Sequence, residues 1–154
     1  MTQEEEKELY KRNHLIKDLC SRLPYEVKAY VKNWSNVDRK YYEDIYDVKS
    51  VFPSLNEVHV QSKSGSLDVL LGYYDYDIKP YLFPLSSMTE EQKQEYSYIV
   101  NYLSPDDTDN WKEGEFVYVE QMSQLMHFFY KNHFDYRGLI PMGLANDATG
   151  LNIY

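Results

Sequence analysis

The chain has very little cysteine, few flexible residues and no long apolar run. A single cysteine, Cys20, excludes an internal disulfide, and six glycines and six prolines exclude a collagen-like or low-complexity chain. The longest apolar stretches are only a few residues, such as 69–71, far short of the roughly 20 residues that a bilayer-spanning helix needs. A secretory signal peptide begins with a basic region that is followed by an apolar one, whereas Met1 to Glu6 are acidic and polar. We therefore expect no export and a cytoplasmic location.

Basic residues are also scarce. Sixteen Lys and Arg stand against 25 Asp and Glu, which gives a formal net charge of −9. Nucleic acids are bound through clustered Lys and Arg that displace counterions, so direct nucleic-acid binding is not expected. The same charge favours a basic protein as partner through long-range steering, although it also serves simple solubility.

Tyrosine is the residue that the chain has in excess, with 17 among 154 residues. A tyrosine ring is large, stiff and apolar with a polar tip, and it is enriched where proteins bind one another. Two segments combine tyrosine with acids, and on adjacent strands of a sheet they would form one acidic aromatic surface. The predicted protein-binding residues are Tyr42, Asp44, Tyr46, Tyr74, Asp75, Tyr76 and Asp77.

Hydrophobic periodicity predicts an α+β fold in a single globular domain, residues 1–154. A helix is expected over 2–22, with Cys20 on its apolar side as a buried residue, or alternatively as a reactive thiol beside Lys17. Alternation of apolar and polar residues predicts an antiparallel meander of about four or five strands; they cover 25–33, 40–51, 57–61, 67–73 and 77–83. Pro80 and Pro84 confine the last of these to a sheet edge or an irregular crossing.

Two C-terminal helices and an irregular tail complete the prediction. Thr89 and Gln92 form a capping box at the start of a helix that ends at Ser104-Pro105. A short extended piece is expected over 115–119, followed by a helix with apolar residues at 122, 125, 126 and 129. The tail from 133 to 154 is rich in turns, and its apolar residues near Leu139 should pack as a clamp.

No catalytic, metal or cofactor motif is present. Asp106, Asp107 and Asp109 do not fit the spacing of a calcium loop, and the four histidines are too scattered for a metal site. Asp75 and Asp77, with Glu43 and Asp47 facing them, are candidate acid pairs for catalysis, but a solvated or protein-binding surface is favoured there. No catalytic, cofactor or metal residue is therefore assigned.

Two segments resemble a family of small uncharacterised proteins of gut Bacteroidales and of their phages and prophages. Residues 78–91, IKPYLFPLSSMTEE, are similar to the family's IKPYLRPMSSMT, and residues 133–145 are similar to its HFDYRGLI..GLA segment. This chain has Phe83 where the family pattern has arginine. The resemblance implies a phage or mobile-element setting and no catalytic residues. The second segment is interpreted as scaffold, with Arg137 bracing a turn through carbonyls or a carboxylate such as Asp135.

Taken together, the sequence favours a non-enzymatic phage or prophage accessory protein that binds a host protein, possibly a basic one, through its acidic tyrosine-rich surface. The alternatives are a self-associating structural protein, with a homo-oligomer seam at 77–83 or 122–129, and a small-ligand-binding protein or enzyme without a sequence motif.

Overall fold

The computed structural model describes residues 1–35, 37–55, 57–71, 76–102 and 111–154, and these residues form two compact units. The first, here called the sheet unit, consists of Met1–Leu82 and Arg137–Tyr154. The second, the helical unit, consists of Phe83–Tyr136. The α+β class predicted from the sequence is confirmed. Each unit is described by itself.

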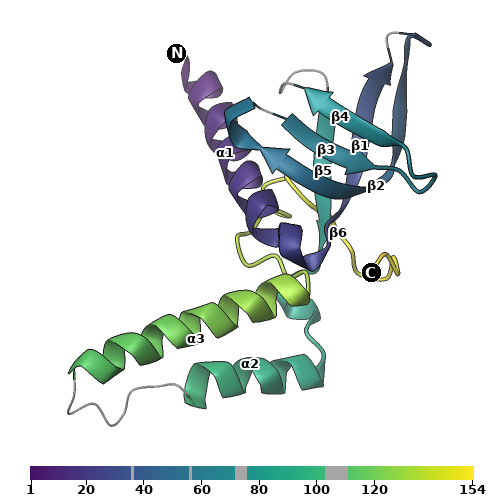
Figure 1. The fold of residues 1–154 in the computed structure, drawn as a ribbon. Coiled ribbons are helices and arrows are strands. Elements are labelled where there is room, and N and C mark those ends of the chain that lie inside the picture. The colour runs from purple at the N-terminus through teal and green to yellow at the C-terminus, as the bar shows by residue number, and fades with distance from the viewer. Residues whose placement is uncertain (36, 56, 72–75, 103–110) are drawn as a thin grey trace. The chain divides into compact units, whose positions relative to one another are not determined.

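In chain order, the sheet unit contains α1 (Gln3–Arg22), η1 (Leu23–Tyr25), β1 (Lys28–Ser35), β2 (Lys40–Phe52), η2 (Pro53–Leu55), β3 (Glu57–Gln61), β4 (Leu67–Leu71), β5 (Tyr76–Leu82) and β6 (Asn146–Asp147). The sheet order is β4-β3-β2-β1-β5-β6 (Figure 1). The first four strands are the expected antiparallel meander, and β5 then returns to pair with β1 rather than with β4. The short parallel strand β6 is a sixth strand that the sequence does not predict.

Helix α1 begins at a capping box and covers one face of the sheet. The Thr2 hydroxyl accepts a hydrogen bond from the Glu5 amide, and the Glu5 carboxylate accepts one from the Thr2 amide. Ile16 and Leu19 of α1 pack against Ala29, Val31 and the other inward side chains of the strands. We call this the inner face of the sheet; the residues that alternate with them, such as Lys28 and Lys32, lie on the outer face.

The position of Cys20 differs from the prediction. Cys20 is exposed, because the side of α1 that packs on the sheet is centred on Ile16 and Leu19. The thiol is not activated either, since partial burial raises its pKa above the ordinary value. The expected buried cysteine is therefore wrong, and the direction of the pKa shift also speaks against a reactive thiol.

A β-bulge explains why the alternation in β2 is irregular. Val48 pairs with Val60, but the next pair is Ser50 with His59, so Lys49 is the extra residue of the bulge. Val48 and Val51 consequently both reach the core, although they are three positions apart. Strand β6 pairs only with Tyr81 and Leu82 of β5, so at Pro80 one side of β5 has no described partner strand. Proline has no backbone N–H to donate, and β5 accepts Pro80 because no hydrogen bond to a strand is needed on that side.

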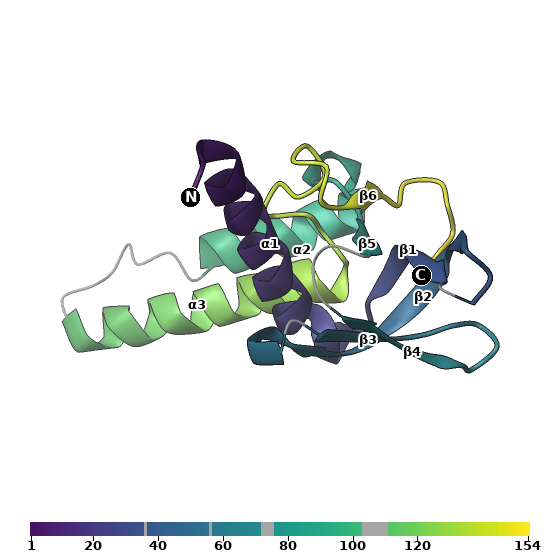
Figure 2. The same ribbon diagram turned by 90° about the horizontal axis from the view of Figure 1, so that it is seen from above.

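The helical unit contains η3 (Leu85–Ser87), α2 (Glu90–Tyr102) and α3 (Trp111–Lys131), and α2 and α3 lie side by side (Figure 2). The predicted capping box of α2 is confirmed, since Thr89 and Gln92 exchange hydrogen bonds of 2.9 and 3.2 Å. The extended piece expected over 115–119 is wrong, because those residues belong to α3. β-Branched and aromatic residues favour a strand locally, but here they continue the helix that carries Leu125 and Phe129.

The two segments that carry the family resemblance meet within the helical unit. The Phe83 amide donates to the His133 carbonyl at 2.9 Å, and the Asp135 amide donates to the Phe83 carbonyl at 2.8 Å. Phe83 and Phe134 thereby form a parallel bridge, and both pack with Phe128 in the core of this unit. Phe83, which replaces the arginine of the family pattern, is here an apolar packing residue.

The tail also forms the apolar cluster that the sequence predicts. Leu139 and Ala145 are buried against Leu82, with Ile140 and Leu144 packed beside them. The Ala148 amide donates to the Leu82 carbonyl at 2.8 Å, which continues the pairing of the tail with β5. The tail therefore closes the end of the sheet next to β5.

Candidate binding surfaces

The predicted tyrosine-acid residues do not form one surface. Strand β1 lies between β2 and β5, so the two segments are not on adjacent strands as the prediction assumed. Asp44 pairs with Val31, which is buried on the inner face, whereas Asp77 pairs with Lys32 on the outer face. The described strands therefore place these two acids on opposite faces of the sheet.

The remaining predicted residues are also separated. Tyr42 and Tyr46 lie on the same side of β2 as Asp44, but only Tyr42 is well exposed, because Tyr46 packs at the margin of the core. Tyr76 is in register with Asn33 of β1. Tyr74 and Asp75 lie outside the described residues. The positions proposed from sequence are thus divided between core margin, outer face and hairpin.

The acids of the outer face are paired with lysines. Lys32 lies between Glu43 and Asp77 in one row across the sheet, and its ammonium is 3.4 Å from the Glu43 carboxylate. Lys79 lies 3.9 Å from Asp77. These carboxylates are therefore engaged in ion pairs with lysines of the same face.

Exposed aromatic residues gather instead at the end of the β1–β2 hairpin. We call Trp34, Val37 and Tyr41 the hairpin surface; all three are exposed, and Val37 is 92% exposed. Tyr42, the next residue of β2, is exposed at the same end of the hairpin but on its opposite side, because it pairs with Asn33 whereas Tyr41 pairs with Trp34. The Trp34 and Tyr41 rings meet edge to face, with centroids 4.9 Å apart. Lys32 and Lys40 lie over the rings of Tyr41 and Tyr42, at 4.8 and 4.7 Å from the ring centroids.

This end of the hairpin extends beyond the neighbouring described strands (Figure 1). Strand β5 pairs with β1 only as far as Asn33, and β3 pairs with β2 only from Asp47. Sequence reasoning missed Trp34 and Val37 because the predicted strands left residues 34–39 as a connection, and it did not select Tyr41 among the tyrosines of the predicted strand 40–51. The signal in the sequence was Trp34, an aromatic residue at the start of that connection, where exposed residues often bind partners.

A cluster of charged side chains, Asp18 and Arg22 of α1 and Arg137 of the tail, connects α1 with the tail. Asp18 is 0% exposed and its Oδ2 accepts from Arg22 Nε at 2.6 Å; Arg22 is itself buried. Arg137 of the tail lies 3.3 Å from Asp18 Oδ1. The sequence predicts that Arg137 braces its turn through carbonyls or a carboxylate such as Asp135; the structure adds a contact with Asp18, which is far away in sequence.

The last residue, Tyr154, fastens the tail to two strands. Its hydroxyl donates to the Tyr81 carbonyl at 2.8 Å and accepts from the Lys28 amide at 3.2 Å. Although 37% of the residue is exposed, protein surrounds the hydroxyl end, and this burial raises its pKa to about 12. Hydrogen bonding with the Lys28 backbone acts in the opposite direction but is weaker.

This shift predicts a loss of stability at high pH. A tyrosine ionises near pH 10 in the unfolded chain, so the stabilisation is complete below pH 10 and decreases as the pH rises towards about 12. Because the residue is partly exposed, we expect the loss from Tyr154 to be about 1 kcal/mol rather than the full two-unit equivalent. Urea unfolding at pH 8 and pH 11 should show this decrease in the wild type and a smaller one in Tyr154→Phe. An equal decrease in both would contradict the assignment.

Two further searches concern metals and membranes. Within the described part of the chain, no group of three His, Cys, Asp or Glu side chains is placed to hold a metal ion. No helix among the described residues is long and apolar enough to span a bilayer.

No family model, no curated protein and no solved structure matches this chain.

Proposed function

We propose that this protein is a non-enzymatic protein-binding module and that the hairpin surface is its contact site. One observation supports this most directly: Trp34, Val37 and Tyr41 are all exposed at one end of a hairpin that extends past its neighbouring strands as far as these are described. Trp and Tyr are the residues most enriched among those that contribute most to protein–protein affinity. This surface replaces the acidic tyrosine surface predicted from sequence.

The chemistry of the hairpin surface suits a protein partner. Lys32 over the Tyr41 ring gives it an apolar centre with a charged margin, as protein interfaces have. Asp38, which accepts from the Tyr42 hydroxyl, adds a negative group to the same margin. The charges near the hairpin are therefore mixed, while the net charge of −9 favours a basic partner at longer range.

For the setting, we propose a phage or prophage accessory protein that binds a host protein. The support is the sequence resemblance of residues 78–91 and 133–145, together with the contact that the two segments make through Phe83 and Phe134. A cytoplasmic location in the bacterial host is part of this proposal.

Affinity capture with matched variants tests the binding site. Tagged wild type is expected to retain one near-stoichiometric protein from a Bacteroidales lysate, whereas Trp34→Ala/Tyr41→Ala should weaken its binding at least 100-fold, because two central aromatic contacts are lost. The measurement is mass spectrometry of the captured protein, followed by titration of the purified partner.

Tyr10→Ala is the matched control, since Tyr10 is an exposed tyrosine of α1 away from the hairpin. It should bind as the wild type does. If both variants bind the partner equally well, the hairpin surface is not the contact site. A basic partner should also bind more weakly in high salt.

Self-association is a second candidate, favoured by the free edge of β4. Strand β4 pairs with β3 on one side and has no described strand on the other. Leu67 and Val69, on its outer face, are 68% and 48% exposed. Such an apolar edge is suited to antiparallel pairing with β4 of a second copy. The seam expected at 77–83 is less suitable, because β5 is paired with β1.

Light scattering tests this candidate. The wild type should form dimers as its concentration rises towards about 1 mM, and Val69→Lys should remain monomeric because a buried ammonium opposes edge pairing. Val119→Lys, on an exposed position of α3, is the control and should dimerise as the wild type does. A monomeric wild type at that concentration rules out the β4 seam.

A further inference from the structure

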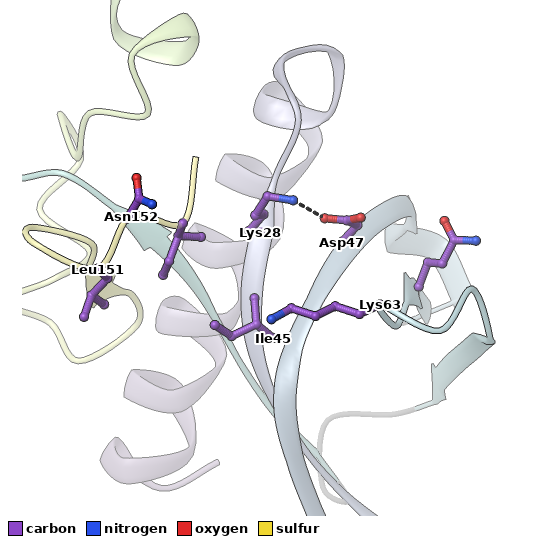
Figure 3. A pocket seen from close by; sticks show the side chains of 8 residues that line it. Lys28, Ile45, Asp47, Lys63, Leu151 and Asn152 are labelled. Carbon is purple, nitrogen blue, oxygen red and sulfur yellow. Dashed lines mark hydrogen bonds and ion pairs between the residues drawn. The ribbon is translucent and has the colours of Figure 1, made fainter.

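A small pocket lies on the outer face of the sheet, between the strands and the C-terminal segment (Figure 3). Its volume is about 220 Å³. Lys28, Ile45 and Asp47 of β1 and β2 form its floor, and Lys63, from the turn between β3 and β4, lies along one side. The segment that ends in Tyr154 forms the opposite side, where the hydroxyl contacts of Tyr154 hold it against β1 and β5.

The pocket carries more positive than negative charge. Among its lining residues, two lysines stand against one carboxylate, in a chain whose net charge is −9. Lys28 is engaged with Asp47 at 2.8 Å and with Glu26 at 3.0 Å, and the hydrogen bond to Asp47 is the main cause of its raised pKa. Lys28 therefore stays protonated and neutralises the only carboxylate of the lining.

Lys63 is the cation that remains available. Among the described residues it has no hydrogen-bond or ion-pair partner, and it extends across the outer face towards Ile45 (Figure 3). An ammonium beside low-dielectric walls attracts a small anion more strongly than one on an open surface. Asn152 lies on the opposite side of the pocket, in the C-terminal segment.

The other walls are apolar. Ile45 lies next to Lys63 (Figure 3), and Leu151 and Ile153 of the C-terminal segment also line the pocket. The volume of the pocket is about 220 Å³. This is smaller than the pockets that take drug-sized ligands, which begin at about 300 Å³. The ligand must therefore be small and must combine one anionic group with an apolar part.

We propose that this pocket binds a small organic anion, a carboxylate or phosphate ester with a compact apolar body, whose charged group pairs with Lys63. The apolar body lies between Ile45 and the C-terminal segment, while the salt-bridged Lys28 keeps Asp47 from repelling the anion. The site is separate from the hairpin surface, so its test does not depend on the proposed protein partner.

Nuclear magnetic resonance titration with benzoate and with phenyl phosphate tests the proposal. Both probes are expected to shift the amide signals of Ile45, Lys63 and residues 151–153 with a Kd of a few millimolar or lower. The tighter of the two identifies the preferred anionic group. Benzamide, which has the shape of benzoate without its charge, should bind at least tenfold more weakly.

Two variants identify the lysine responsible. Lys63→Met keeps most of the side-chain length without the charge and should raise the Kd of the better probe about tenfold. Lys17→Met removes one charge from an exposed position of α1 and should leave the Kd unchanged. The proposal is overturned if neither probe shifts the pocket signals below about 10 mM, if benzamide binds equally well, or if both variants weaken binding to the same extent.

Discussion

Replacing Asp18 by asparagine is expected to lower the free energy of unfolding by about 3 kcal/mol. Asp18 contacts both Arg22 and Arg137, and its side chain is fully buried. Without its charge, the buried Arg22 guanidinium loses an ion pair that offsets its desolvation. The effect should lie at the lower end of the usual range, because Arg137 is partly exposed to water.

Urea unfolding at neutral pH measures this change. Glu8→Gln is the matched control, because Glu8 is an acid of the same helix whose ion pair with Lys11 is exposed, and it should change the stability by less than about 0.5 kcal/mol. The double variant Asp18→Asn/Arg22→Met should lose less stability than the sum of the losses in the two single variants. The reason is that each single variant leaves one buried charge without its ion pair, whereas the double variant removes both charges. Additive losses would show that the two side chains do not stabilise each other.

Phe128→Ala is expected to destabilise the helical unit by about 3 to 4 kcal/mol. Phe128 is fully buried, and its ring lies 5.7 to 6.0 Å from those of Phe129, Phe134 and Tyr96. Alanine would leave a cavity among these rings, because their positions are also constrained by the backbone pairing of Phe83 with residues 133 and 135.

Native-state hydrogen exchange distinguishes a local from a global effect. Amides of α2 and α3 should lose protection in Phe128→Ala, whereas the exposed control Val119→Ala should change little. Whether β1 and β3 of the sheet unit lose protection at the same time measures the coupling between the units. Unchanged protection of α2 and α3 would contradict the assigned role of Phe128.

Local sequence patterns predicted most of the secondary structure for a physical reason. The alternation of Val27, Ala29 and Val31 specifies which side of β1 is buried, and the Thr89–Gln92 capping box specifies where α2 begins. These features depend on residues within one or two turns of each other. The mistaken strand over 115–119 shows the limit of such patterns, because tertiary packing decided in favour of the helix there.

The candidate site was much less predictable. The composition identified an excess of tyrosine, but the prediction assumed that the two tyrosine-acid segments were neighbours. Insertion of β1 between β2 and β5 separated them, and the alternation of side chains placed Asp44 and Asp77 on opposite faces. Neither event can be recognised from one segment alone, because both depend on strand order and register.

The sequence by itself determined the α+β class and the capping and periodicity of its main elements. Tertiary structure alone decided that Arg137 reaches Asp18, that Trp34 and Tyr41 meet at an exposed hairpin end, and that the C-terminal segment forms one wall of a pocket with Lys63. The reason is distance along the chain. Local propensities act between near neighbours, whereas these contacts join residues that become adjacent only when the sheet has closed around its core.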